Sequence, residues 1–306
     1  MPSFRTLKTF LAVTKYGTFA AAAKEIGLTA AAVGLQIRSL EDELNQVLFD
    51  RGARSVVLNT AGRRVMPQVK ELLLQYESLV ASGDTDELSG TVVMGALVSA
   101  LMGAFADALW SLKHAHPRLE VRLLAGLSAD FARRVEVGEL DAAVVTQSPR
   151  PLPSGLVWSP LYAEPMVLIV PRRPHFKMTG NPIDILCDAP FLRFDRQTWT
   201  GYLVNDVLSR CKVTVRDEME LNSVEAIVEI VRQGFGISIV PRLANIQWAR
   251  DQSLKIIPLP GIDVQRHVGL IERTRHSRQQ FTDAIKQYFQ ASNGDDRAKN
   301  VRARQT

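Results

Sequence analysis

Apolar residues recur at helical spacing near the N-terminus and predict two short helices. The face of the first helix carries Leu7, Phe10, Leu11 and Thr14. Gly17 ends this pattern, because glycine accepts a left-handed conformation without steric penalty. Thr18 is placed to cap a second helix, Phe19 to Ile26, which Gly27 closes in the same way.

A third amphipathic helix is predicted from Ala30 to about Leu44, with Thr29 as its N-cap. Its core face carries Val33, Ile37, Leu40 and Leu44. Its opposite face presents Ala31, Leu35, Arg38, Ser39 and Asp42. Two helices joined by a turn with glycine predict a helix-turn-helix over residues 18–38, although an αα-hairpin without a DNA role has the same signature. Leu35 suits thymine methyl groups and Arg38 suits phosphate or guanine, but a lone exposed leucine is also ordinary surface.

The segment after the third helix predicts two short strands around a basic tip. Leu48, Phe49 and Arg51 precede the tip, and the run from Arg54 to Leu58 follows it. Such a hairpin is a wing, and its Arg51 and Arg54 are placed to straddle a DNA backbone or minor groove.

These residues match the pattern of a known family in register and without a gap. The matching residues are Leu7, Phe10, Val13, Gly17, Phe19, Ala22, Ala23, Ile26, Thr29, Val33, Gln36, Ile37, Leu40, Glu41, Leu44, Leu48, Phe49, Arg51, Arg54, Leu58, Ala61 and Gly62. The chain therefore resembles the LysR-type transcriptional regulators, which implies a winged helix-turn-helix that binds duplex DNA. The candidate DNA-binding residues are Arg5, Thr29, Ala30, Ala31, Gly34, Leu35, Gln36, Arg38, Arg51 and Arg54.

The third helix also departs from the family pattern. Thr29-Ala30-Ala31 stands where members usually carry Ser-Gln-Pro, and Gly34 stands where they carry serine or threonine. Because these residues offer no side-chain hydrogen bonds beyond Thr29, more of the readout is expected from apolar contact, Gln36 and DNA shape. A glycine inside a helix costs roughly 1 kcal/mol against alanine, which indicates either a close approach or a tolerant site.

Between Ala61 and Val80 the apolar positions follow a heptad-like spacing. They are Val65, Val69, Leu72, Tyr76 and Leu79. This spacing pairs two helices in a coiled coil, but one helix packed on its own domain gives the same pattern over so short a run. The resemblance implies a linker helix that joins two subunits, and hence a DNA site with two related halves. Residues 82–86 are predicted to form a hinge.

From Thr91 onward, apolar strand-like runs alternate with amphipathic helices. Strands are predicted at Thr91–Leu97, Leu119–Leu124, Asp141–Val145, Met166–Val170, Phe191–Phe194, Ile237–Val240 and His267–Glu272. Helices are predicted at Ser99–His114, Ala129–Gly138, Trp199–Cys211, Val224–Gln233 and Arg278–Gln290. The alternation predicts a parallel sheet covered on both faces, and the polar end of the chain predicts a disordered tail.

Three segments of this region resemble the effector-binding domain of the same family, which is similar to periplasmic binding proteins. They are Gly138–Ala143, Glu164–Leu168 and Gly234–Pro241. The resemblance implies two α/β lobes with a ligand cleft at strand ends and helix N-termini. The candidate effector-binding residues are Ser99, Ser128, Thr146, Trp199 and Thr200, each of which is also an ordinary cap or turn residue. Hydroxyls and helix N-termini favour an anionic or polar small molecule, for example a carboxylate, with Trp199 as a stacking face.

Composition narrows the class of protein. The chain has 306 residues, of which 46% are apolar and 23% charged, so a globular protein is expected. The N-terminus lacks a signal core, and no run reaches the ~20 apolar residues of a membrane span. With Cys187 and Cys211 as reduced thiols, a cytoplasmic protein is expected. Residues 1–64 carry nine Lys and Arg against five Asp and Glu, which suits a polyanionic partner.

The sequence carries no catalytic signature. Its five histidines lack metal-ligand spacing, and it has neither a Gly-x-Ser-x-Gly elbow nor a phosphate loop. We therefore expect no enzyme, no metal and no cofactor other than the effector. The expected partners are double-stranded DNA, one or three further copies of the chain, and RNA polymerase if the regulator activates. The alternatives are a solute-binding protein, disfavoured by the N-terminal domain, and a constitutive DNA-binding protein with a vestigial cleft.

The predicted organisation is an all-α winged helix-turn-helix with a linker helix, followed by a two-lobed α/β domain. The DNA-binding domain is assigned to residues 1–62, and the linker and hinge to 63–90. The effector-binding domain is assigned to 91–291, with lobe I at 91–161 and 268–291 and lobe II at 162–267. The disordered tail is predicted at 292–306.

Overall fold

The computed structural model describes two compact units. It describes residues 3–52, 55–81, 88–173, 176, 180–243 and 251–303, without the side chains of 51, 74, 77–81 and 292–303. Unit 1 comprises residues 1–86 with 137–139 and 275–277, and unit 2 comprises the remainder. The predicted hinge at 82–86 lies outside the described residues. Among the helices of the described residues, none combines the length and the apolar character that crossing a membrane requires.

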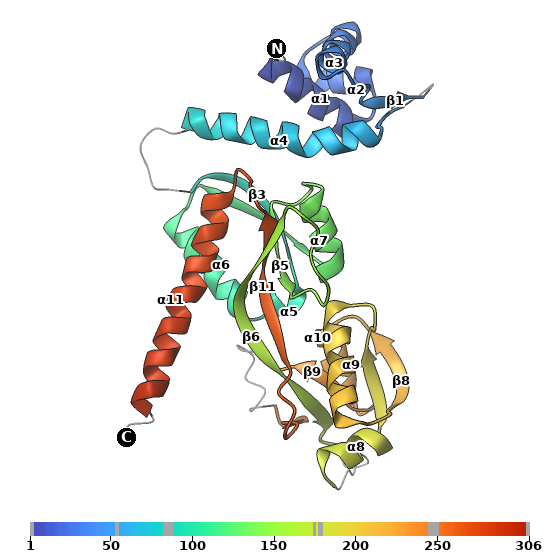
Figure 1. Cartoon of the computed structure of the whole chain (residues 1–306), viewed down its shortest axis with the longest axis vertical. Helices are drawn as coiled ribbons and strands as arrows, with labels where there is room; N and C mark the ends of the chain where they lie inside the picture. Colours follow the sequence, from blue (N-terminus) through green and yellow to red (C-terminus); the bar gives the residue numbers. More distant parts are fainter. Residues whose placement is uncertain are drawn as a thin grey trace. The chain divides into compact units, whose positions relative to one another are not determined.

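Unit 1 begins with three short helices whose ends are set by local capping. Its elements are α1 (Phe4–Tyr16), α2 (Phe19–Ile26), α3 (Ala30–Leu44), β1 (Phe49–Arg51), β2 (Val56–Leu58) and α4 (Thr60–Ala81) (Figure 1). Thr18 and Thr29 each accept a hydrogen bond from the backbone N–H three residues later, as predicted for N-caps. Gly17, Gly27 and Asn45 end the three helices with positive φ, which only glycine and asparagine adopt readily.

The core of unit 1 lies where α1 and α3 meet the wing, the antiparallel hairpin of β1 and β2. Phe10, Val33 and Ile37 are fully buried there. The buried carboxylate of Glu41 accepts hydrogen bonds from the backbone N–H groups of Leu48 and Phe49. This side chain therefore fixes the start of the wing against the end of α3.

Helix α4 divides the apolar positions that the sequence assigns to one seam. Val69 is buried in the core of unit 1, and so is Leu73, which the predicted seam omits. Leu72 and Tyr76 are 47% and 39% exposed, and Tyr76 stacks on Phe4 of α1 with 3.9 Å between ring centroids. Part of α4 therefore packs on its own unit, whereas Leu72 and Tyr76 face outward.

Unit 2 is built on a mixed sheet of seven strands. The strand order is β10-β6-β11-β5-β3-β4, with β9 also paired to β6. The strands are β3 (Gly90–Ala96), β4 (Leu119–Ala125), β5 (Ala142–Thr146), β6 (Leu156–Pro171), β9 (Ser238–Pro241), β10 (Leu254–Ile257) and β11 (Gln265–Arg273). Because β11 lies between β5 and β6 and runs antiparallel to both, the predicted parallel sheet is in fact mixed. Within this sheet the neighbouring strands β4, β3 and β5 pair in parallel.

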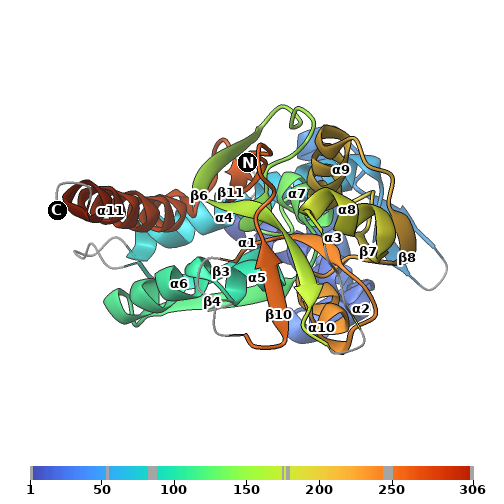
Figure 2. The ribbon, with the colours of Figure 1, turned by 90° about the horizontal axis from the view of Figure 1, so that it is seen from below.

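Helices divide unit 2 into two lobes with separate hydrophobic cores. Lobe I contains α5 (Val98–Leu101), α6 (Ala104–Ala115), α7 (Ser128–Glu136) and α11 (Gln279–Ala303). Lobe II contains α8 (Pro182–Asp188), α9 (Trp199–Cys211), α10 (Val224–Gln233) and the parallel pair β7 (Pro190–Phe194) and β8 (Arg216–Leu221). Figure 1 shows β6 and β11 side by side from lobe I to lobe II, and Figure 2 shows α6 and α11 on the same side of the sheet. In the described part of the chain, these two long strands therefore connect the lobes.

Several predicted elements differ from the observed ones. The single helix predicted at 99–114 is two helices, α5 and α6, because Gly103 adopts an extended conformation that interrupts the helix. Residues 292–303 continue α11 where a disordered tail was predicted, since extending an existing helix costs far less than starting one. Residues 304–306 are outside the described residues. The elements α8, β8 and β10 have no counterpart in the prediction.

Candidate ligand cavity and nucleic-acid interface

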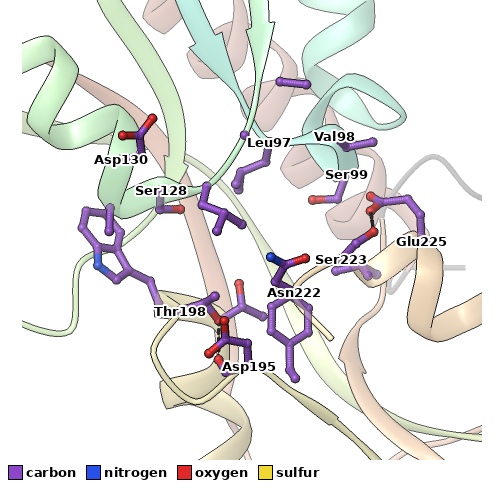
Figure 3. Close-up of a pocket in the computed structure, with 18 of the residues that line it drawn as sticks. Leu97, Val98, Ser99, Ser128, Asp130, Asp195, Thr198, Asn222, Ser223 and Glu225 are labelled. Carbon is purple, nitrogen blue, oxygen red and sulfur yellow. Dashed lines mark hydrogen bonds between the residues drawn. The ribbon is translucent and has the colours of Figure 1, made fainter. Parts of the chain in front are cut away.

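A cavity of about 510 Å³ opens between the two lobes of unit 2. Lobe I contributes residues 97–99 after β3 and 125–130 from the end of β4, and lobe II contributes 194, 195, 197–200 and 222–225 (Figure 3). Four of the five predicted effector-binding residues line it, namely Ser99, Ser128, Trp199 and Thr200. Thr146 does not line the cavity; it is buried, and its hydroxyl lies 3.4 Å from that of Thr200. Thr146 therefore contacts lobe II outside the cavity and does not face the cavity itself.

The two serines of lobe I each keep a hydroxyl hydrogen for another partner. Ser99 Oγ accepts a hydrogen bond from Nη1 of Arg266 at 3.1 Å. The predicted capping role of Ser99 is wrong, because α5 begins after Leu97 and has no side-chain cap. Ser128 Oγ accepts from the backbone N–H of Thr146 at 3.1 Å. Since each oxygen is used as an acceptor, its own O–H group remains suited to donate.

Behind Ser99 lies a buried ion pair that the sequence pattern did not indicate. Arg266 and Glu164 are both 1% exposed, and Nε of Arg266 donates to Oε2 of Glu164 at 2.8 Å. A second donor, Nη2 of Arg266, reaches the same oxygen. Burial, and then the negative charge of Glu164, raise the pKa of the neighbouring Tyr162 phenol, while Arg266 opposes this effect. Arg266 lines the cavity, but its positive charge is already neutralised.

On lobe II a tight loop precedes α9. Thr198 caps α9 by accepting from the N–H of Gly201 at 3.0 Å, and its hydroxyl donates to the carbonyl of Asp195. A Cβ on Gly201 would lie 1.9 Å from that carbonyl oxygen, so the approach of loop and helix requires glycine. Oδ1 of Asp195 accepts from the N–H of Gln197 at 2.8 Å. The loop thus holds the carboxylate of Asp195 at the cavity wall.

The start of α10 brings a second carboxylate to lobe II. Ser223 caps this helix by accepting from the N–H of Ala226 at 3.2 Å. The Ser223 hydroxyl donates to Oε2 of Glu225 at 2.6 Å, as Figure 3 shows. Oε1 of Glu225 is buried and has no hydrogen-bond partner among the described residues. Asp195 and Glu225 were not predicted; their place after a strand and in the first turn of a helix is the signal that could have indicated them.

The outward face of α3 is exposed. Thr29, Ala30, Ala31 and Arg38 are exposed, as is Arg5 of α1, and Leu35 is 66% exposed. Gly34 and Gln36 are half-buried. Among the described residues, a Cβ on Gly34 would approach only Phe19, at 4.0 Å, so no contact within this part of the chain requires glycine there. Oε1 of Gln36 accepts a hydrogen bond from the Thr9 hydroxyl at 2.6 Å, which anchors part of this side chain to α1.

The basic tip of the wing is only partly described. The backbone of Arg51 belongs to β1, and Arg54 lies outside the described residues. The first turn of α4 adds Arg63 and Arg64, which are exposed and which the sequence analysis did not select. Arg63 donates to the carbonyl of Leu58 at 2.6 Å, next to the wing. The Arg-Arg pair directly after a predicted wing was the signal available in the sequence.

Comparison with protein families matches both parts of the chain. The family described as "Bacterial regulatory helix-turn-helix protein, lysR family" matches residues 4–63. The family described as "LysR substrate binding domain" matches residues 85–293. The second match includes both lobes and the cavity between them.

Relatives match over nearly the whole chain. A "Probable RuBisCO transcriptional regulator" of Nostoc sp. is 28% identical over 288 residues, 92% of this chain and 86% of the relative. The "Hydrogen peroxide-inducible genes activator" of Haemophilus influenzae is 26% identical over 278 residues, 89% of this chain and 90% of the relative.

Solved structures share the fold. Full-length OxyR of Pseudomonas aeruginosa, in a substituted form, has a TM-score of 0.69 at 18% identity and covers 94% of each chain. CbnR, described as a LysR family transcriptional regulator, has a TM-score of 0.55 at 20% identity and covers 92% of this chain and 99% of its own. At these identities the likeness shows the winged helix-turn-helix and two-lobed architecture alone.

Proposed function

Because the chain belongs to the LysR family of bacterial transcriptional regulators, we propose that α3 reads its DNA site and that the cavity between the lobes binds its effector. The chain is a DNA-binding transcriptional regulator with an effector domain, and members of the family are regulators rather than enzymes. The observation that carries the assignment of α3 is its outward face, where Leu35 is 66% exposed beside exposed Arg38.

The proposed DNA contacts follow from what each side chain of α3 offers. Leu35 meets thymine methyl groups, and Arg38 binds phosphate or guanine. The N-terminus of α3, at Ala30 and Ala31, presents backbone N–H groups toward a phosphate. Arg5, Arg51 and Arg54 complete the proposed contacts with the DNA backbone and minor groove. Because alanine and glycine dominate the start of α3, DNA shape supplies a larger share of specificity than in relatives with polar residues there.

Substitution of Arg38 tests this assignment. Arg38→Ala should reduce the slope of the logarithm of the DNA-binding constant against the logarithm of salt concentration by about one. Each phosphate contact releases counterions from the DNA on binding, and this variant makes one contact fewer. The matched control is Arg210→Ala, on α9 of lobe II, whose side chain pairs with Asp206 and is 52% exposed. DNA binding is measured over a salt series with the full chain and a bound genomic fragment. An unchanged slope for Arg38→Ala would remove this face of α3 from the interface.

We propose that copies of the chain pair through α4. Exposed Leu72 and Tyr76, with Phe4 stacked beside Tyr76, form an apolar stripe that one copy leaves in water. A symmetric contact between two such stripes presents two α3 helices to one DNA site, and two dimers give the tetramer. Family membership supports oligomerisation in general, and the stripe supports this particular surface.

We propose a ligand-driven change in the angle between the lobes as the switch. The lobes meet at the cavity and through the Thr146–Thr200 contact, so a molecule bound between them favours one lobe angle over others. The linker helices then alter the spacing of the two α3 helices on DNA. Action on chromosomal DNA assigns the protein to the cytoplasm, and contact with RNA polymerase follows where the regulator activates. The proposed domain bounds are those given by the sequence, 1–62, 63–90 and 91–291.

A further inference from the structure

We propose that the effector of this protein carries a protonated amino group, which the carboxylates of Asp195 and Glu225 bind. This inference rests on the proposed function, because it names the chemical class of the molecule that the cavity holds. It adds two binding residues from lobe II to the hydroxyl-bearing residues already assigned. It also restricts the broader sequence expectation of an anionic or polar ligand.

The charges that line the cavity are unequal. The charged residues of its wall are Asp130, Asp195, Glu225 and Arg266. Two of them are compensated, since Asp130 pairs with Arg133 at 2.7 Å and Arg266 pairs with Glu164. Within the described part of the chain, neither Asp195 nor Glu225 has an ion-pair partner within 4.0 Å. The cavity therefore presents two uncompensated negative charges.

The hydrogen-bond environment of the two carboxylates supports the same conclusion. Oε1 of Glu225 is buried without a hydrogen-bond partner in the described residues, while Oε2 is bound by Ser223. In the described part of the chain, the Asp195 carboxylate accepts one hydrogen bond, from the backbone N–H of Gln197 to Oδ1. Both carboxylates therefore receive few hydrogen bonds from the described residues, and a cationic donor binds such a group more strongly than a neutral donor does.

An ammonium group fits these carboxylates better than the other charged ligands do. A dicarboxylate would meet two like charges, which the neutralised Arg266 does not offset. A metal ion needs more ligands, and the described residues contain no group of three or more His, Cys, Asp or Glu side chains able to hold one. An ammonium group carries three donors, and it can bind carboxylates from separate elements. Asn222 lines the same cavity as Asp195 and Glu225 and is labelled with them in Figure 3.

The opposite wall specifies the other end of the ligand. The hydroxyl oxygens of Ser99 and Ser128 of lobe I both accept hydrogen bonds. Each O–H group can therefore donate to an acceptor on the effector. A carboxylate or hydroxyl oxygen meets that requirement, which retains part of the sequence expectation. The ligand class is therefore an amino acid, or another amine that also carries an oxygen acceptor, bridging lobe I to lobe II.

The experiment uses the full chain and defined probes. The twenty common amino acids, 1,4-diaminobutane, succinate and glutarate are tested by thermal shift, and each hit is measured by isothermal titration. We expect an amine-bearing probe to bind. Asp195→Asn and Glu225→Gln should each weaken that binding by at least about tenfold, because each loses a charge-assisted hydrogen bond. Asp130→Asn is the control, since it removes a carboxylate on the lobe I side of the same cavity that Arg133 already neutralises; the affinity of this variant should change less than about twofold.

The outcomes separate this inference from the proposed function. Binding of succinate or glutarate in preference to every amine, or binding by no amine at all, overturns the amino-group proposal. Amine binding that survives in both Asp195→Asn and Glu225→Gln, with the parent melting temperature in each variant, also overturns it. DNA binding without any probe is measured in parallel; its absence contradicts the proposed function itself, whatever the probes do.

Discussion

Gly34 is the residue of α3 whose presence the interior of the protein explains least. It lies inside a fifteen-residue helix, where glycine costs about 1 kcal/mol relative to alanine. A Cβ at this position would lie 4.0 Å from Phe19, an ordinary contact distance. The missing side chain therefore suits a surface that approaches α3 from outside the chain, which under the proposed function is the floor of the major groove.

Gly34→Ala should stabilise the protein and weaken its DNA complex. The unfolding free energy is expected to rise by about 1 kcal/mol, because the helix gains intrinsic propensity without an internal clash. Affinity for a bound genomic fragment should fall at least several-fold, since the added methyl group holds α3 away from the bases. Thermal denaturation and DNA titration measure the two effects. An equal or tighter complex would show that the glycine reflects tolerance at this site.

The Arg266–Glu164 pair permits a second prediction at this scale. Glu164→Ala should destabilise the chain by about 3–5 kcal/mol, because it leaves the guanidinium buried and unpaired. Replacing both residues, as Glu164→Leu with Arg266→Met, should recover much of that loss, since no buried charge then remains. Chemical denaturation of the three proteins tests this. A double variant no more stable than Glu164→Ala would mean that the pair stabilises the fold through more than charge neutralisation.

At the scale of elements, α4 serves two surfaces with one apolar pattern. Val69 and Leu73 belong to the core of unit 1, whereas Leu72 and Tyr76 are exposed. Because buried and exposed positions alternate within one turn of the helix, adjacent leucines have different roles. Neighbouring residues of the same helix therefore serve the folding of the winged helix-turn-helix and the proposed pairing of two chains.

Leu73→Ala and Leu72→Ala should separate these two roles. Leu73→Ala is expected to cost about 2–5 kcal/mol of unfolding free energy, the usual loss for a truncated core leucine. Leu72→Ala should change that energy by less than about 0.5 kcal/mol and should weaken self-association. Denaturation at one protein concentration and sedimentation over a concentration series distinguish the two. A dissociation constant unaffected by Leu72→Ala would exclude this stripe as the pairing surface.

Local signals in the sequence predicted the elements better than their partners. The caps Thr18 and Thr29 and the stops at Gly17 and Gly27 are local, and α2, α3, α9 and α10 were predicted to within a residue. The direction of β11 depends on pairing with residues of β5 and β6 that lie about a hundred positions or more earlier in the chain, so the mixed sheet was missed. The strand β8, with Arg216 and Glu220, is largely exposed and lacks the apolar alternation that identifies strands.

The same distinction holds for the cavity. Ser99, Ser128, Trp199 and Thr200 were predicted because each follows a strand or begins a helix, which is visible locally. Thr146 follows the same rule, but its hydroxyl faces Thr200 rather than the cavity. The direction in which the Thr146 side chain points depends on tertiary packing, and so does the pairing of Arg266 with Glu164, which are 102 positions apart in the chain. Neither has a signature in the surrounding residues.

At the scale of the whole molecule, the proposed pairing through α4 would duplicate the helix that we propose to read DNA. A symmetric dimer should protect two related half-sites whose centres are separated by a multiple of about 10–10.5 base pairs. Deleting one half-site from a bound fragment should weaken binding by at least about tenfold, because the second contact is then lost. Footprinting and titration of both fragments test this. Equal affinity for the complete and the half fragment would contradict symmetric readout by a pair.

The hydrogen bond between Thr9 and Gln36 limits the base contacts that Gln36 of α3 can make. Thr9 uses one of the two lone pairs of the Gln36 carbonyl oxygen and holds that oxygen toward α1, so the NH₂ group is the part of the amide best placed for DNA. The two-pronged amide pairing that singles out adenine, which needs an acceptor and a donor together, is therefore disfavoured. What the NH₂ group can address is any base edge rich in lone pairs, such as N7 and O6 of guanine or O4 of thymine. The operator position beneath Gln36 should consequently exclude cytosine on the contacted strand more strictly than it distinguishes among the other three bases.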